Sequence, residues 1–159
     1  MKRAALVLLT LAAPAGAAEK PLDMVAFFTG RSHAENTLKI AFSKPTKLIV
    51  DSVGGKGDRG DFVLIDTIHE GDKPVRTRKW ILHPVGPGHY AGSLSDATGP
   101  VDIVMGADVA TIRYTMNGGL KVTQQLRFST DGRSLTNSVD VRKFGMRFAR
   151  VDGTIRKLD

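Results

Sequence analysis

The chain has no cysteine among its 159 residues. Disulfide bonds, thiol catalysis and zinc sites with cysteine ligands are therefore excluded. An acylated cysteine, which would tether an exported protein to a membrane, is excluded for the same reason. We accordingly expect a protein that is soluble once it is exported.

Long hydrophobic runs are also missing. The longest apolar run covers residues 4–13, which is too short to span a bilayer. Two basic residues precede it, and the small residues of segment 14–18 follow it. This order is typical of a secretory signal. We predict a signal peptide at residues 1–18, a single domain at residues 19–159, and a periplasmic or secreted location.

Large aromatic side chains are few, because the whole chain has one tryptophan, two tyrosines and seven phenylalanines. A modest supply of large side chains favours unfilled space inside the fold over a solidly packed interior.

The net charge is +7 at pH 7. A moderate positive charge favours acidic surfaces such as lipid headgroups, so peripheral contact with an anionic membrane is one expected interaction. A solvated basic exterior explains the same charge without any partner. We expect no binding to nucleic acid, because the sequence has neither a recognition-helix pattern nor the aromatic pattern of an RNA-binding sheet.

Apolar and polar residues alternate with a period of two from Thr37 to Ile155, and Gly, Asp, Asn or Pro interrupts them at short intervals. This pattern predicts an all-β protein, a single antiparallel meander β-barrel of about eight to ten strands. The segment 21–29 is expected to form a short helix or an extended lid at one end. Five of the strands are expected at residues 37–42, 46–53, 89–95, 101–105 and 146–155.

Two turns in the second half of the chain predict a register. Asn117-Gly118-Gly119 is interpreted as a three-residue hairpin loop, and Asp131-Gly132 as a two-residue turn. The predicted opposite pairs are Met116 with Leu120, Tyr114 with Val122, Ile112 with Gln124, Phe128 with Leu135, Leu126 with Asn137, Gln124 with Val139, and Val122 with Val141. Gln124 and Asn137 are then the only polar members of this inward face.

The turn around Gly71-Asp72 gives a third register in the first half. With a three-residue loop, Phe62 lies opposite Leu82 and Leu64 opposite Trp80. Asp66 then lies opposite Arg78, and both point inward. The sequence therefore predicts an ion pair inside the barrel.

This interior predicts a binding site for a small amphipathic or lipid-like ligand such as a fatty acid. Apolar walls with a few placed polar groups are typical of ligand sites. Aromatic and aliphatic side chains would hold the apolar body, while Arg78 and two amides would meet a carboxylate or phosphate, because a guanidinium makes paired, charge-assisted hydrogen bonds. The predicted ligand-binding residues are Asp66, Arg78, Trp80, Tyr114, Gln124, Phe128 and Asn137. No cofactor is expected.

A second interpretation stays open. Buried amides can satisfy each other, and a buried Asp-Arg pair can plug a filled barrel. The protein would then be a non-catalytic structural or protein-interaction module of the bacterial envelope.

Enzymatic activity is not expected. The four histidines form no cluster at spacings of two or four residues, and no Gly-x-Ser-x-Gly motif occurs. We expect no metal site, and histidines that lie on the surface near loops.

Several short motifs occur in a shared order along the chain. They are Phe27-Phe28-Thr29-Gly30, Arg78-Lys79-Trp80, Tyr90-Ala91-Gly92 with Asp96 and Gly99, Tyr114-Thr115-Met116, Asn137, and Lys143-Phe144-Gly145. In this order the chain resembles DUF3833, an uncharacterised family of exported bacterial lipocalin-like proteins. The resemblance implies a calycin-type barrel and no particular activity. Many members look like lipoproteins with an acylated cysteine, which this sequence lacks.

Overall fold

The computed structural model describes residues 23–159, so the predicted signal peptide lies outside the described residues. One short helix precedes ten strands. The elements are α1 (Met24–Phe28), β1 (Gly30–Ile40), β2 (Thr46–Lys56), β3 (Phe62–Glu70), β4 (Arg76–Gly86), β5 (His89–Leu94), β6 (Val101–Met105), β7 (Val109–Met116), β8 (Leu120–Phe128), β9 (Ser134–Lys143) and β10 (Met146–Lys157).

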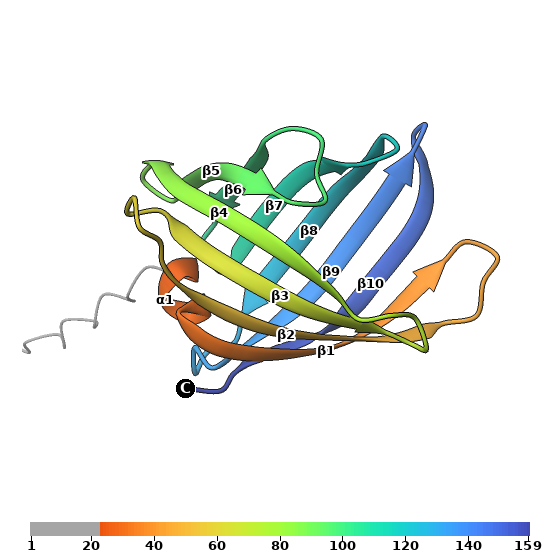
Figure 1. Ribbon diagram of the computed structural model, residues 1–159, viewed down its shortest axis with the longest axis horizontal. Helices are drawn as coiled ribbons and strands as arrows, with labels where there is room; N and C mark the ends of the chain where they lie inside the picture. The colour runs from red at the N-terminus through yellow and green to blue at the C-terminus, as the bar shows by residue number, and fades with distance from the viewer. Residues whose placement is uncertain (1–22) are drawn as a thin grey trace, which may run out of the picture.

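The ten strands form one closed antiparallel barrel, in which each strand pairs with its neighbours in sequence and β1 pairs with β10. Figure 1 shows α1 at one end of the barrel, near the C-terminus. The predicted all-β meander barrel is therefore confirmed. Closure pairs the first strand with the last and so removes the exposed sheet edges that invite aggregation.

The three predicted registers are confirmed. Asp66 lies opposite Arg78, Ile112 opposite Gln124, and Leu126 opposite Asn137. One turn is wider than predicted, because residues 129–133 connect β8 to β9. The amide of Gly132 donates to the carbonyl of Ser129 at 3.1 Å. The wider loop is centred on the same two residues as the predicted turn, so the register is unchanged.

The prediction for the first strand, residues 37–42, was wrong at both ends. β1 begins at Gly30 and ends at Ile40. Its buried positions include Ser32, Ala34 and Asn36, which are small or polar and give no hydrophobic alternation. Phe42 lies in the following turn, with a φ of 63°.

The segment before β1 forms the predicted short helix rather than an extended lid. Asp23 caps α1, because its carboxylate accepts the amide of Ala26 at 3.0 Å. The helix buries Met24, Phe27 and Phe28 in the end of the barrel. Within residues 23–159, no helix is long and apolar enough to cross a lipid bilayer.

A glycine lets the helix approach the wall of the barrel. A Cβ atom on Gly54 of β2 would lie 2.1 Å from the carbonyl oxygen of Phe28, which is closer than Cβ atoms approach other atoms in real proteins. Only glycine therefore fits at this position. On the opposite side, Phe27 packs edge-to-face on Phe128, with ring centroids 5.9 Å apart. The helix therefore closes this end of the barrel against both β2 and β8.

Candidate functional site

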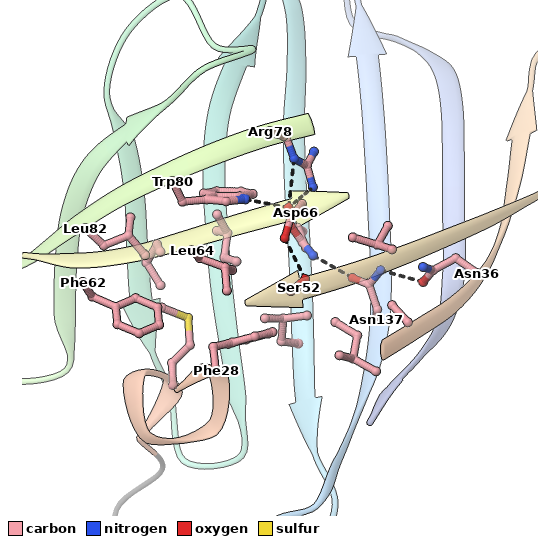
Figure 2. Close-up of a pocket in the computed structure, with 18 residues that line it drawn as sticks. Phe28, Asn36, Ser52, Phe62, Leu64, Asp66, Arg78, Trp80, Leu82 and Asn137 are labelled. Atoms are coloured by element: carbon pink, nitrogen blue, oxygen red, sulfur yellow. Dashed lines mark hydrogen bonds and ion pairs between the residues drawn. The ribbon is translucent and has the colours of Figure 1, made fainter. Parts of the chain in front are cut away.

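A buried carboxylate lies at the centre of the barrel interior. Asp66 on β3 is 3% exposed. Its Oδ2 atom accepts the Nε and Nη2 atoms of Arg78 at 3.1 and 3.0 Å and the indole Nε1 of Trp80 at 2.8 Å. Its Oδ1 atom accepts the hydroxyl of Ser52 on β2 at 2.7 Å. Figure 2 shows these side chains converging from β2, β3 and β4.

Arg78 is held on two sides. Besides Asp66, the ring of Trp80 lies under the guanidinium, with Cζ 5.1 Å from the ring centroid. Burial disfavours the cation, but the attractions of Asp66, Tyr114 and Asp96 together outweigh burial, so the pKa of Arg78 is raised above its ordinary value. Arg78 thus remains charged inside the barrel. Asp66 accepts only the Nε and Nη2 atoms of Arg78, so Nη1 is not bound to this carboxylate, and the phenol of Tyr114 lies near the same guanidinium.

A chain of amides crosses the interior beside this ion pair. Gln124 on β8 donates Nε2 to Oδ1 of Asn137 on β9 at 2.8 Å, and Asn137 donates Nδ2 to Oδ1 of Asn36 on β1 at 2.9 Å. Asn36 in turn donates to the carbonyl of Leu48 at 3.4 Å. The chain links four strands through side chains.

Asn36 and Asn137 meet across an intervening strand. Gly153 of β10 lies opposite both residues in the two registers. A Cβ atom on Gly153 would lie 2.5 Å from Oδ1 of Asn36. The missing side chain therefore leaves the space in which the two amides bond.

These polar groups separate two cavities. The inner cavity, of about 80 Å³, lies next to α1 and has mostly apolar walls. The outer cavity, of about 310 Å³, extends toward the other end of the barrel. Five residues line both cavities, namely Asn36, Val50, Arg78, Gln124 and Asn137. The polar groups therefore form the floor of the outer cavity.

The outer cavity combines an apolar wall with a charged rim. Its aliphatic lining residues include Leu38, Leu120, Val122, Val139 and Val141. At the rim it is lined by Glu70, Lys73, Arg76 and Phe148. Lys73 and Phe148 are exposed as well as lining, so the cavity reaches the surface at the end opposite α1.

The structure brings together five of the seven predicted ligand-binding residues at the inner cavity. These are Asp66, Arg78, Trp80, Gln124 and Asn137. Tyr114 lines the outer cavity instead and packs edge-to-face on Trp80, with ring centroids 5.7 Å apart. Phe128 lines neither cavity and packs on Phe27 of the helix.

Two polar residues of the site were missed in the sequence. Ser52 and Asn36 share their strand faces with Val50 and Leu38, respectively, so strand parity alone places them inward. A search for apolar alternation overlooks such positions, because a serine or an asparagine interrupts the apolar pattern.

Burial affects Tyr114 as well. Desolvation raises the pKa of its phenol above the ordinary value of 10.0, and the nearby Arg78 offsets part of the effect. The phenol is therefore neutral over the physiological pH range and can donate or accept a hydrogen bond at the wall of the outer cavity.

The histidines lie on the outside of the barrel. Nδ1 of His33 and Oδ1 of Asp51 are 2.6 Å apart, and Nε2 of His89 lies 2.6 Å from Asp102. His33 lies within β1 rather than in a loop. Within residues 23–159, no three His, Cys, Asp or Glu side chains are grouped so that they could hold a metal ion.

Comparison with known proteins agrees with this architecture. The family model described as a protein of unknown function, DUF3833, matches residues 11–157. The chain belongs to the DUF3833 family. No curated protein matches the sequence.

Two solved structures show that the DUF3833 barrel has structural relatives. The S-type phycobiliprotein lyase CPES from Guillardia theta has a TM-score of 0.68 at 7% identity, covering 85% of this chain and 90% of the lyase. A DUF3598 protein of unknown function from Nostoc punctiforme has a TM-score of 0.63 at 11% identity, covering 91% of this chain and 53% of that protein. At these identities the likeness is one of fold.

Proposed function

We propose that this protein binds a small amphipathic, lipid-like molecule in the outer cavity, with the polar head at Arg78. The observation that carries the proposal is the position of Arg78, a charged group that lines both cavities. Two of its nitrogens are fixed by Asp66, while Nη1 is not bound to that carboxylate. A guanidinium held in this way is preorganised to bind an acceptor oxygen.

Size favours the outer cavity over the inner one. Apolar cavities of about 150 Å³ accept a benzene-sized molecule. The inner cavity, at about 80 Å³, is smaller than such a benzene-sized cavity. The outer cavity, at about 310 Å³, has roughly twice the volume of a benzene-sized cavity. The outer volume is at the lower end of the range of small-molecule sites.

The chemistry of the floor selects the head group. Each of the amides of Gln124 and Asn137 uses one N–H bond within the amide chain, which leaves each a second N–H bond to donate. Because Asp66 balances the charge of Arg78, the floor offers donors without a large excess of positive charge. A carboxylate or phosphate head is the group that such donors satisfy, and a fatty acid is the simplest ligand with this head and an apolar body.

We infer binding without turnover. Among residues 23–159, no histidine lines either interior cavity, and the carboxylate of Asp66 already accepts four hydrogen bonds. The lyase shares only the fold, so no activity is transferred from it. We also propose, on the sequence of residues 1–18 alone, that the protein acts after export in the periplasm.

The alternative is a structural or interaction module, and one observation favours it. Asp66 and the amides of Gln124, Asn137 and Asn36 are all bonded to other protein groups. Such a network can stabilise a barrel without any ligand.

Titration with decanoate and with decanol distinguishes the two functions. Both ligands have an alkyl chain of the same length, but only decanoate carries a charged head group. The emission of Trp80, the only tryptophan, reports binding because its ring contacts Arg78. We expect decanoate to bind at least about tenfold more tightly than decanol, as a charge-assisted hydrogen bond implies.

The variant Arg78→Gln should abolish this difference, whereas Arg113→Gln, on the outer face of β7, should leave it unchanged. Mass spectrometry of the protein purified with its own N-terminus should also detect a copurified acidic lipid and give the first residue of the mature chain. Three results together would support the alternative, a structural or interaction module. They are that neither ligand changes Trp80 emission, that no lipid copurifies, and that Arg78→Gln only lowers the Tm.

A further inference from the structure

The most exposed large hydrophobic residues gather at the end of the barrel opposite α1. Phe42 is 108% exposed, Phe144 89% and Met146 71%, while Phe148 is 40% exposed at the rim of the outer cavity. We name these four residues the mouth patch. They come from the β1–β2 and β9–β10 hairpins, which Figure 1 shows at the end away from α1. The amide of Ala41 donates to the carbonyl of Phe148 at 2.9 Å and joins the hairpins.

Two phenylalanines of the mouth patch have backbone conformations that suit glycine. Phe42 has a φ of 63° and Phe144 a φ of 51°. Every other residue with positive φ in the range 23–159 is a glycine. The left-handed region is strained for a bulky side chain, and such strain clusters at functional positions. Neither ring is buried in the protein, so packing within the barrel does not explain why phenylalanine occupies these turns.

Positive charge surrounds the patch. The segments 39–47 and 142–147 contain six basic residues and no acidic one. The nearby carboxylates are paired with basic side chains: Glu70 at the cavity rim pairs with Lys73, and Asp140 pairs with Arg142 and Arg147. Nζ of Lys143 lies 5.7 Å from the ring centroid of Phe144, so a cation and an aromatic ring project together from the hairpin.

We propose that the mouth patch docks on an anionic lipid bilayer. The two phenylalanine rings insert at the level of the headgroups, and the surrounding lysines contact the lipid phosphates. Exposed aromatic residues combined with a basic surround are the features by which peripheral proteins bind anionic membranes. Because Phe148 belongs both to the patch and to the cavity lining, docking brings the mouth of the outer cavity against the bilayer. The inference holds whether or not the cavity is occupied.

Vesicle sedimentation tests the docking. The full chain, expressed with its own N-terminus and purified after any processing, is mixed with vesicles of phosphatidylcholine alone or with phosphatidylglycerol added. We expect sedimentation with the anionic vesicles only, and weaker binding at high salt. The double variant Phe42→Asn with Phe144→Asn should bind at least about tenfold more weakly, since each ring buries a large apolar area.

Asparagine is chosen because it tolerates left-handed backbone, so the double variant should be at least as stable as the wild type. The matched control replaces Val85 and Leu158, which are 51% and 51% exposed and lie near the end closed by α1, with asparagine; its vesicle binding should equal that of the wild type. All variants share one N-terminus, so any contribution from that segment cancels in the comparison.

Two results would overturn the proposal. One is wild-type protein that ignores anionic vesicles, or that binds them equally well without the two rings. The other is a dimer in light scattering that dissociates in the Phe42→Asn, Phe144→Asn variant while no vesicle binding occurs, which would assign the patch to a second copy of the chain. Neither result would affect the decanoate titration, so docking and ligand binding fail or succeed separately.

Discussion

Trp80 donates its indole N–H to the same Asp66 oxygen that accepts both guanidinium bonds of Arg78. The three residues come from two neighbouring strands, and Asp66 lies opposite Arg78 in the register. One carboxylate thereby fixes the cation of the proposed binding site and the aromatic ring beneath it. The site is consequently rigid before any ligand enters.

Removing the charge of Asp66 should destabilise the protein. Asp66→Asn leaves Arg78 as an uncompensated cation inside the barrel, and breaking a buried pair in this way costs about 3 kcal/mol. Chemical denaturation followed by circular dichroism measures the loss. The matched control is Asp108→Asn, which breaks the exposed pair with Arg127 and should cost less than about 1 kcal/mol. Equal losses for the two variants would contradict the importance of the interior pair.

Two serines that face each other across β1 and β2 should differ in their contribution to stability. Ser52 donates to Asp66 at 2.7 Å, so Ser52→Ala should cost about 2 kcal/mol, as for other hydrogen bonds to charged groups. Ser32, its partner in the register, has a buried hydroxyl with no hydrogen bond to residues 23–159. Ser32→Ala should therefore be neutral or stabilising. The difference between the two unfolding free energies is the decisive measurement, and a larger loss for Ser32→Ala would refute the argument.

The barrel, its registers and the inward ion pair were predictable because turn chemistry and strand parity agree. Asn117-Gly118-Gly119 specifies a three-residue loop, and a two-residue loop at this position would misalign the apolar faces of the two strands. The interior placement of Arg78 then followed from the position of a single turn. Local signals of this kind act over short separations in the chain.

The features of the fold and of the candidate site that the sequence did not predict depend on contacts between residues far apart in sequence. Asn36 and Asn137 are 101 positions apart, and their hydrogen bond needs both the closure of the barrel and the missing side chain of Gly153. The early start of β1 was missed because small and polar residues face inward there. Phe128 was expected to line the ligand cavity, but helix α1 reaches it first, and the sequence does not indicate on which rings the helix packs.

Tyrosine titration should report the surroundings of the outer cavity. The pKa of Tyr114 is raised chiefly by burial, and that of Tyr90 is raised by burial and by Asp23. The folded protein therefore holds its phenolic protons above pH 10, where the unfolded chain releases them. The contribution of these two tyrosines to the free energy of unfolding should be fully present below about pH 10 and should be lost as the pH rises further. Phenolate absorbance measured in the folded and the urea-unfolded protein tests the order of the two titrations.

Arg78 offsets part of the shift in Tyr114, because a nearby cation favours the phenolate. Arg78→Gln should therefore raise the pKa of Tyr114 further, while Tyr114→Phe should leave a single titrating group and reduce the loss of stability at alkaline pH. A pKa for Tyr114 at its ordinary value in the folded wild type would show that water reaches the phenol freely, and a pKa below that value would show that the attraction of Arg78 outweighs burial.

Closure of the barrel by α1 should depend on Gly54. A methyl group at this position would lie 2.1 Å from the carbonyl oxygen of Phe28, and backbone cannot yield as a flexible side chain does. Gly54→Ala should therefore displace the helix and cost at least about 2 kcal/mol. The adjacent Gly55 supplies the control, since a Cβ atom there would have no neighbour within 4 Å. Gly55→Ala should change the unfolding free energy by less than about 0.5 kcal/mol.

Hydrogen exchange distinguishes local from global effects of Gly54→Ala. If the helix is displaced, the amides of Phe27 and Thr29, which bond to Asp23 and Val25, should lose protection first, while the β8–β9 pairing stays protected. The inner cavity would then open at the helix end, because Met24 and Phe28 form part of its lining. Uniform loss of protection across all strands would instead mean that Gly54 stabilises the whole barrel and that α1 has no separate function as its closure.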